Sequence, residues 1–174
     1  MKALRQLGRW KLNVRLDSED PEDGRVLALF RNRAELKKSY AIELETVQNY
    51  LANSIDLEGT DAELVRKSLE EEITLKLKHA RRLAKRIHIL GGRLPGSLAL
   101  PRNQNLLQPP SDNADMMAVI RGVISANEGS ISQYQKIIHL TEGHDYVTQD
   151  MVIDLLSDER EHRRLFLSFL TQNA

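Results

Sequence analysis

Apolar residues recur at helical spacing in four separate parts of the chain. Residues three or four apart on a helix share a face, so such a stripe predicts an amphipathic helix with one buried side. The four stripes fall within about residues 25–55, 60–90, 113–142 and 148–172. The sequence therefore predicts four long helices packed around one core, which is an all-α fold.

Each apolar stripe is interrupted near its middle by polar side chains. These are Glu43 in the first stripe, Lys76 and, at its edge, His79 in the second, Asn127 in the third, and Glu159 and His162 in the fourth. Burying a charged group is unfavourable unless the group is paired or coordinates a metal. The interruptions are therefore predicted to meet at a common interior point. Glu45, by contrast, lies off the first stripe and is expected to face solvent.

The segment between the second and third stripes is rich in proline. Residues 92–112 hold four of the five prolines, so this segment cannot continue a helix. It is also long for a tight turn between helices, and an extended crossover along the bundle is expected. Four helices with one long crossover have the connectivity of ferritin-like four-helix bundles. The predicted division is an N-terminal extension, residues 1–23, followed by a bundle over residues 24–172.

Turn and cap residues mark the ends of the predicted helices. Thr60 and Glu63 have the spacing of a capping box at the start of the second helix, and Gly91-Gly92 marks its end. Thr148 is the expected N-cap of the fourth helix. Within residues 1–23, a strand-like alternation precedes an acidic stretch. A docked or frayed segment is favoured there over a DNA-binding arm.

The composition narrows the classes of function. The chain of 174 residues has a formal net charge of zero, which argues against nucleic acid or an anionic membrane as a partner. It has no cysteine, so any metal must be held by carboxylate and imidazole groups. No apolar run approaches the roughly 20 residues of a membrane span, and the N-terminus lacks the apolar region of a secretory signal. The expected location is the cytoplasm.

The fourth stripe carries the most specific chemical pattern. Glu159 and His162 are three residues apart and share the face that should point into the core. A Glu-x-x-His pair inside a helical bundle is the ligand pattern of a carboxylate-bridged di-iron or di-manganese site. The alternative interpretation is a buried polar network without metal.

Three stretches of this sequence resemble bacterioferritins. The clearest is residues 144–162, which closely resembles the fourth-helix region of that family. Ile42-Glu43-Leu44 with Val47-Gln48-Asn49-Tyr50 resembles the first helix, and Lys78-His79-Ala80-Arg81-Arg82 followed by Gly91-Gly92 resembles the second. The resemblance covers about residues 30–170. It implies a ferritin-like bundle, iron storage or ferrous oxidation, and assembly into a homo-oligomer, a dimer or larger.

The resemblance also implies a set of metal ligands. Bacterioferritins hold two irons with one Glu on the first helix, Glu-x-x-His on the second, one Glu on the third and Glu-x-x-His on the fourth. The matching residues here are Glu43, His79, Glu159 and His162. The second-helix Glu is replaced by Lys76. The haem-ligating methionine of the family falls on Leu77, so no haem is expected.

The third-helix ligand position is ambiguous by one residue. Counted by helical phase it falls on Asn127, and a shift of one residue brings Glu128 into the position. A count back from Glu159 without gaps lands on Ala126 instead. Glu128 is therefore kept as a candidate ligand beside the residue that the phase favours.

The charge of the inward set argues against an ordinary pair of irons. Glu43, Glu159 and Lys76 together carry a net charge of −1, whereas four carboxylates balance two divalent ions. An ammonium about 4 Å from a divalent ion repels it by about 8 kcal/mol at an effective dielectric constant near 20. The sequence predicts at most one tightly bound ion, iron or manganese, and leaves ferroxidase activity undecided.

Three outcomes are therefore distinguished. In the first, Lys76 forms a salt bridge with Glu43 or Glu159 that replaces the metals, and the protein is a structural or interaction module. In the second, Lys76 leans toward Glu72 or toward solvent, and one ion binds through Glu43, His79 and Glu159 or through Glu159, His162 and Glu128. In the third, the chain is an oxidase or oxygenase of a small molecule, which requires an open pocket beside the metal.

Overall fold

A computed structural model of the chain describes residues 21–172. The predicted N-terminal extension lies outside the described residues except for its last three positions, which are helical. The strand-like alternation and most of the acidic stretch are likewise outside them. Among residues 21–172, no helix is long and apolar enough to span a lipid bilayer.

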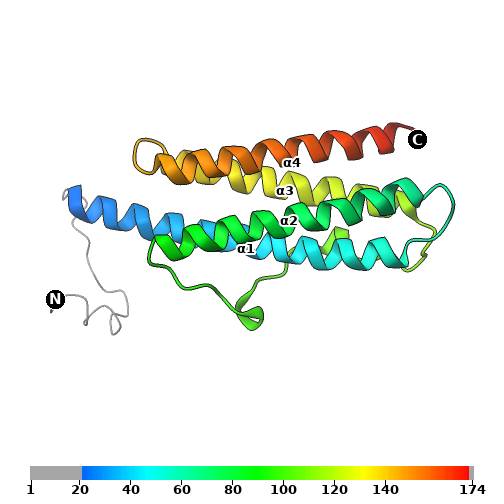
Figure 1. Ribbon diagram of the computed structural model, residues 1–174, viewed down its shortest axis with the longest axis horizontal. Coiled ribbons are helices and arrows are strands. Elements are labelled where there is room, and N and C mark those ends of the chain that lie inside the picture. Colours follow the sequence, from blue (N-terminus) through cyan, green and yellow to red (C-terminus); the bar gives the residue numbers. More distant parts are fainter. Residues whose placement is uncertain (1–20, 173–174) are drawn as a thin grey trace.

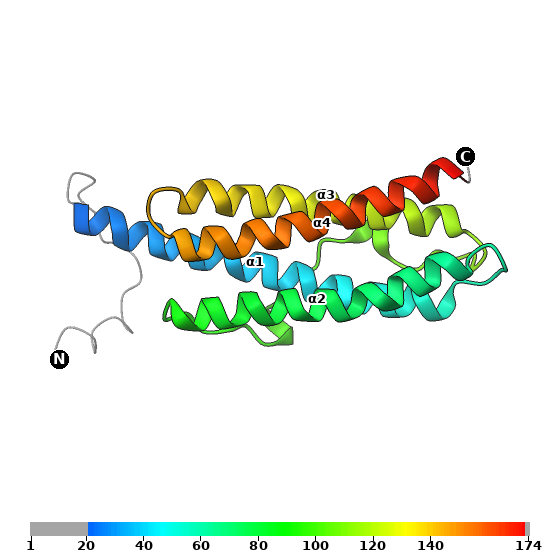
Figure 2. The ribbon, with the colours of Figure 1, turned by 45° about the horizontal axis from the view of Figure 1, so that its top comes forward.

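The fold consists of four long helices, as the apolar stripes predict. They are α1 (Pro21–Asp56), α2 (Glu63–Ile89), α3 (Met116–Thr141) and α4 (Tyr146–Gln172). Figures 1 and 2 show α1 paired with α2 and α3 paired with α4, and the two pairs stack into a bundle. The all-α prediction is confirmed.

The proline-rich segment is the predicted long crossover. It joins α2 to α3 and contains two short 3-10 helices, η2 (Ser97–Ala99) and η3 (Asn105–Leu107). The crossover carries the chain from one end of the bundle to the other, so α2 and α3 run in the same direction (Figure 1). Glu45 holds this segment in place by accepting hydrogen bonds from the backbone N–H groups of Asn103 (2.9 Å) and Gln104 (3.0 Å). The expectation that Glu45 faces solvent is therefore wrong, because the crossover covers that side of α1.

Two apolar clusters form the core, and each helix contributes to both. One cluster includes Tyr50, Leu69, Val123 and Phe166, and the other includes Leu36, Leu83, Tyr134 and Leu155. On every helix the polar interruption lies between the residues of the two clusters in sequence. The antiparallel pairing of the helices therefore brings the interruptions to the same level of the bundle, near its middle.

The ends of α2 and α4 agree only in part with the predicted caps. Gly91 has a φ of +73°, and the N–H of Gly92 donates to the carbonyl of Ile87 at 2.8 Å, which closes α2 as predicted. The capping box is not formed, because α2 begins at Glu63 itself and no side chain caps it. The N-cap of α4 is Asp145 and not Thr148, since the Asp145 carboxylate accepts from the Thr148 N–H at 3.0 Å.

Close packing of the crossover on α3 gives a first testable prediction. A Cβ added at Gly122 would lie 2.4 Å from the carbonyl oxygen of Leu106, so the two backbones touch only because the residue is glycine. We expect Gly122→Ala to destabilise the fold by about 1–3 kcal/mol. Thermal unfolding followed by circular dichroism measures the change. Gly129→Ala is the matched control, because a Cβ there meets nothing within 4 Å, and an unchanged or higher melting temperature is expected.

Candidate metal centre

The polar interruptions of the four helices are all buried in the middle of the bundle. Glu43, Lys76, His79, Asn127, Glu159 and His162 are each at most 3% exposed. Of the predicted ligands, Glu43, His79 and Glu159 form one group, in which one donor atom from each residue lies within 4.8 Å of the others. α1, α2 and α4 thus contribute one potential metal ligand each to the same point.

The distances within this group are close to those of a coordination sphere. His79 Nδ1 lies 3.5 Å from Glu159 Oε1 and 3.7 Å from Glu43 Oε2. Two ligands that each lie about 2.1 Å from an ion are separated by about 3.0–3.4 Å in octahedral or tetrahedral geometry. Small inward movements of the three side chains are therefore sufficient to hold one ion.

A third carboxylate, that of Asp158, orients the imidazole of His79. His79 Nε2 lies 3.1 Å from Asp158 Oδ2, at the solvent side of the group. A carboxylate on the outer nitrogen is a common support for a metal-binding histidine, because it turns the other nitrogen toward the metal. Here that inner nitrogen is Nδ1, which faces Glu43 and Glu159.

Lys76 forms a buried ion pair inside the same group. Its ammonium donates a hydrogen bond to Glu159 Oε1 and lies 4.0 Å from Glu43 Oε2. Burial alone lowers the pKa of Lys76, but Glu159 and Glu43 outweigh burial, so the pKa is raised and the ammonium stays charged. Burial likewise raises the pKa of Glu159, but Lys76 and His79 lower it to about 2. Lys76 therefore pairs with Glu159, as in the first outcome above, and does not lean toward solvent.

His79 adds a second positive charge. Burial lowers the pKa of His79, but the neighbouring carboxylates of Glu159 and Glu43 raise it to about 9. At neutral pH the imidazole is therefore protonated in the metal-free protein. The charges of Lys76 and His79 then balance those of the two carboxylates.

Several buried atoms of this group nevertheless lack a partner. Within residues 21–172, Glu43 Oε2, His79 Nδ1 and Glu159 Oε2 have no hydrogen-bond partner. The other oxygen of Glu43 accepts from the hydroxyl of Tyr134, whose pKa is raised well above its usual value by burial and by nearby carboxylates. Buried polar atoms without a partner are uncommon in folded proteins. Two of these atoms, Glu43 Oε2 and His79 Nδ1, lie 3.7 Å apart and fit a single cation, whereas the Lys76 ammonium does not fit a bridged pair of ions.

His162 belongs to a second, adjacent group. Its Nδ1 lies 3.2 Å from the side-chain nitrogen of Asn127 and 3.5 Å from Glu72 Oε2. Burial and the charge of Lys76 lower the pKa of His162 to about 3, so this imidazole is neutral. Asn127 Oδ1 in turn accepts a hydrogen bond from Tyr50 at 3.4 Å. The structure therefore places His162 beside Asn127 and Glu72 and outside the group around His79.

Glu128 lies on the surface. Its side chain is 54% exposed and pairs with Arg163 at 2.7 Å. One residue along a helix turns a side chain by about 100°, so Asn127 and Glu128 cannot both face the core. The assignment by helical phase places Asn127 inward, and the set Glu159, His162 and Glu128 is not brought together.

Sequence reasoning gave little weight to two residues near the centre. Glu72 belongs to the run Glu70-Glu71-Glu72, which has the pattern of a solvated helix face, and Asp158 lies beside the apolar stripe of α4. Glu72 precedes Lys76 by four residues and therefore shares its face of α2. That spacing is the signal that points to Glu72, whereas nothing in the sequence indicates that Asp158 reaches His79.

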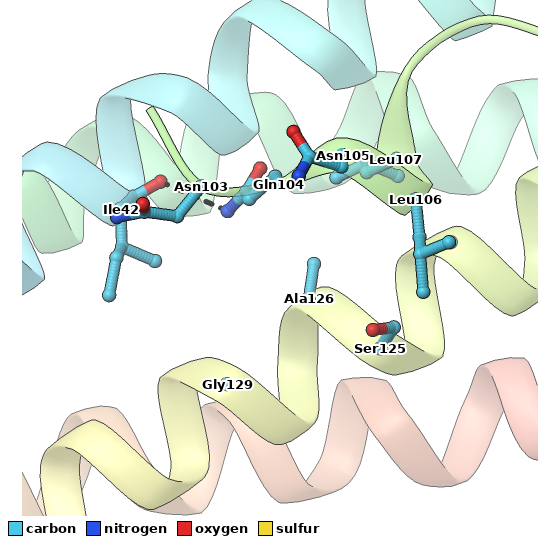
Figure 3. A pocket seen from close by; sticks show the side chains of 10 residues that line it. Ile42, Asn103, Gln104, Asn105, Leu106, Leu107, Ser125, Ala126 and Gly129 are labelled. Carbon is cyan, nitrogen blue, oxygen red and sulfur yellow. Dashed lines mark hydrogen bonds between the residues drawn. The ribbon is translucent and has the colours of Figure 1, made fainter. Parts of the chain in front are cut away.

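Cavities open on two sides of the bundle. One of about 280 Å³ lies between α1, the crossover and α3, where Gln104 and Asn105 face Ser125 and Ala126 (Figure 3). Glu43, His79 and Glu159 do not line it. A smaller cavity of about 190 Å³ between α2 and α4 is lined by seven residues, among them Glu72, Asp158 and His162. The cavity between α2 and α4 therefore reaches His162, one of the buried polar residues.

Comparison with known proteins extends these observations. A family model described as "Ferritin-like domain" matches residues 33–173. The DNA protection during starvation protein of Pyrococcus furiosus is 27% identical over 142 residues, covering 78% of this chain and 75% of that protein.

Two solved structures share the fold at lower identity. The bacterioferritin-related protein from Bacteroides fragilis, described as a dodecameric thioferritin, has a TM-score of 0.70 and 24% identity over 83% of this chain and 86% of its own. A ferritin-like, diiron-carboxylate protein from Bacillus anthracis has a TM-score of 0.72 and 19% identity over 82% of this chain and 97% of its own.

Proposed function

This chain belongs to the ferritin-like family, and on that basis we propose that it binds one divalent metal ion, Fe²⁺ in the first instance, through Glu43, His79 and Glu159. The family match confirms the resemblance at the level of the ferritin-like fold. The observation that carries the metal assignment is local: Glu43 Oε2 and His79 Nδ1 are buried 3.7 Å apart without a hydrogen-bond partner within residues 21–172, and Glu159 Oε1 lies 3.5 Å from the same nitrogen. Carboxylate oxygen and imidazole nitrogen are suitable ligands for iron or manganese.

Each side chain has a defined part in this proposal. Glu43 and Glu159 supply anionic oxygens, and His79 supplies Nδ1 once its proton has left. Asp158 holds the outer nitrogen of His79, and Tyr134 donates to the oxygen of Glu43 that faces away from the ion. A bound iron ion would supply one-electron redox chemistry, and the surrounding core excludes bulk water from it.

The charge of Lys76 limits the centre to one ion. Its ammonium is hydrogen-bonded to Glu159, the carboxylate that would have to bridge a second ion. We therefore expect about one iron per chain after anaerobic loading with Fe²⁺ and desalting, and little oxygen consumption afterwards. Metal analysis and an oxygen electrode give the two readouts.

Metal analysis and the oxygen electrode can also contradict this proposal. Glu43→Gln should lose the retained iron, whereas Glu128→Gln, which changes a surface carboxylate, should keep it. Two irons per chain with rapid oxygen consumption would contradict the single-ion centre.

The second candidate is a ferritin-fold module that uses no metal. The observation that favours it is the balance of charge, because Lys76 and protonated His79 neutralise Glu43 and Glu159 without an ion. The chain would then serve in assembly or interaction, and its centre would be a structural salt bridge. If the purified protein carries neither iron nor manganese, and retains neither after loading, the metal-free module is the correct function.

Assembly and location are also proposals. We propose a homo-oligomer in the cytoplasm, because the fold is shared with a dodecameric relative. The zero net charge does not favour an electrostatic contact with nucleic acid. Light scattering coupled to size-exclusion chromatography measures the oligomer size.

A further inference from the structure

We propose that Trp10, in the segment of the chain that precedes α1, inserts its indole into a cavity at the end of the bundle where α1 begins. Figures 1 and 2 show that α4 also begins at this end and that α2 and α3 end there. The cavity has a volume of about 440 Å³ and is lined by residues of α1, α2, α3 and the turn between α3 and α4. This inference does not depend on a metal ion or on the proposed function.

Apolar and polar side chains share the lining of this cavity. Its leucines are Leu29, Leu90 and Leu140, and its polar members are Asn32, Arg86, His144 and Asp145. An indole has the same mixed character, because it combines a large apolar ring with a single N–H donor. The ring would lie against the leucines, and the N–H needs one acceptor among the polar residues.

Asn32 supplies that acceptor. Its side chain is 4% exposed, its nitrogen donates to Asp145 Oδ2 at 3.0 Å, and its Oδ1 has no hydrogen-bond partner within residues 21–172. Burial raises the pKa of Asp145, but hydrogen bonds from Thr148 and Arg86 lower it below its usual value, so the carboxylate is ionised and can only accept. The amide of Asn32 is therefore fixed with its nitrogen toward Asp145, and Oδ1 is left for another donor.

The rim of the cavity must open slightly to admit the ring, because Asn32 Oδ1 is itself buried. Leu29 is the rim residue with room to move, since it is 38% exposed and exposed side chains change rotamer within nanoseconds. An indole that packs against Leu90 and Leu140 removes about 150–250 Å² of its own surface from water. The rearrangement therefore increases the apolar area that the bundle buries.

Trp10 is close enough to the cavity to reach it within the same chain. It is the only tryptophan of the sequence, and ten residues separate it from Pro21, where α1 begins. Ten residues span up to about 33–36 Å. Leu29 lies about 12 Å along α1 from Pro21, so the connection is long enough for the chain to turn back along its first helix.

The residues that follow Trp10 also suit this end of the bundle. Three large apolar side chains that adjoin the cavity lining in sequence are at least 66% exposed, namely Ile89, Tyr146 and Val147. In an extended chain alternate residues point to the same side, so the apolar residues two, four and six positions after Trp10 would share its side. These are Leu12, Val14 and Leu16. The segment that carries Trp10 would therefore cover an apolar surface that the bundle leaves exposed.

Fluorescence of the full-length native protein tests the insertion, because Trp10 is the only source of tryptophan emission. An inserted indole should emit to the blue of free tryptophan and resist quenching by acrylamide. Leu29→Glu places a charge at the cavity and should shift the emission to the red and increase the quenching. Leu165→Glu is the matched control, since Leu165 is 37% exposed and lies about 30 Å along α4 from Asp145, and it should change neither property. Circular dichroism confirms that both variants are folded.

A pair of engineered cysteines identifies the chain whose cavity is occupied. The protein has no cysteine of its own, so a short bis-maleimide can join only the two thiols of the variant Leu12→Cys, Leu29→Cys. We expect a product within one chain, which runs as a monomer in a denaturing gel. A product that joins only two chains, or no product, would overturn the proposal. Native emission equal to that of free tryptophan, or emission that Leu29→Glu leaves unchanged, would overturn it as well.

Discussion

Replacing Lys76 with methionine is expected to destabilise the metal-free protein by about 3–5 kcal/mol. Methionine keeps the length and apolar stem of the side chain but leaves Glu159 buried without its partner. Breaking a buried ion pair by removing one member has a cost of this size, because the remaining charge is uncompensated. For a chain of this length the melting temperature should fall by about 6–20 °C. Thermal unfolding in the presence of a chelator measures the change.

The same variant should bind metal more tightly than the native protein. Without the ammonium, Glu43 and Glu159 attract a divalent ion with no competing positive charge from Lys76. We expect the affinity for Co²⁺ to rise by at least about 100-fold, equivalent to about 3 kcal/mol, and saturating metal to restore much of the lost stability. Lys78→Met, at an exposed position on the same helix, should change neither stability nor affinity appreciably. A metal-free Lys76→Met protein as stable as the native one would contradict the structural role of the pair.

The pH dependence of the variant gives a further check. In the native protein the pKa of Glu159 is lowered to about 2, so its pairing contributes stability above the unfolded pKa near 4.5, and the contribution is lost as the pH falls toward 2. In Lys76→Met the principal partner is gone and burial favours the neutral carboxyl. The stability deficit of the variant should therefore shrink as the pH is lowered from 7 to about 4. A deficit that grows over this range would show that another group causes it.

The helices and the level of the site follow from the periodicity of the sequence. The stripes of α1 and α4 place Glu43, Glu159 and His162 inward because burial of the flanking apolar residues fixes the rotation of each helix. The phase of α3 likewise selects Asn127 over Glu128. The inward face of a helix is fixed by apolar residues over several turns. An error of one residue in the position of a helix end therefore does not change which side chains face the core.

The helix ends and the pairing inside the site were less predictable. Thr148 was expected as the cap of α4, but Asp145 also has a side chain that can cap, and only the three-dimensional path of the chain decides between them. The direction of Lys76 depends on which carboxylate its long side chain reaches, so the sequence left both outcomes open. The contact between Asp158 and His79 was equally hard to predict, because it joins side chains of two different helices, α4 and α2.

Restoring carboxylates at the two substituted positions should create a centre for two irons. In the double variant Lys76→Glu, Asn127→Glu, four carboxylates and two imidazoles face the interior, and their formal charge of −4 balances two ferrous ions. We expect iron binding to rise from about one to about two ions per chain, together with faster oxygen consumption on adding Fe²⁺ than in the native protein. Anaerobic loading, metal analysis and an oxygen electrode measure both effects.

The metal-free form of this variant should be unstable, because four buried carboxylates then repel one another. Its melting temperature should rise steeply with Co²⁺ or Fe²⁺, and this shift reports ligand geometry even if the metal-free chain does not fold. The control Lys78→Glu, Asn113→Glu makes the same chemical changes at exposed positions and should gain neither iron nor oxygen consumption. If the double variant binds no more metal than Lys76→Met, the backbone no longer holds the two positions at bridging distance, and the departure from the family extends beyond the two side chains.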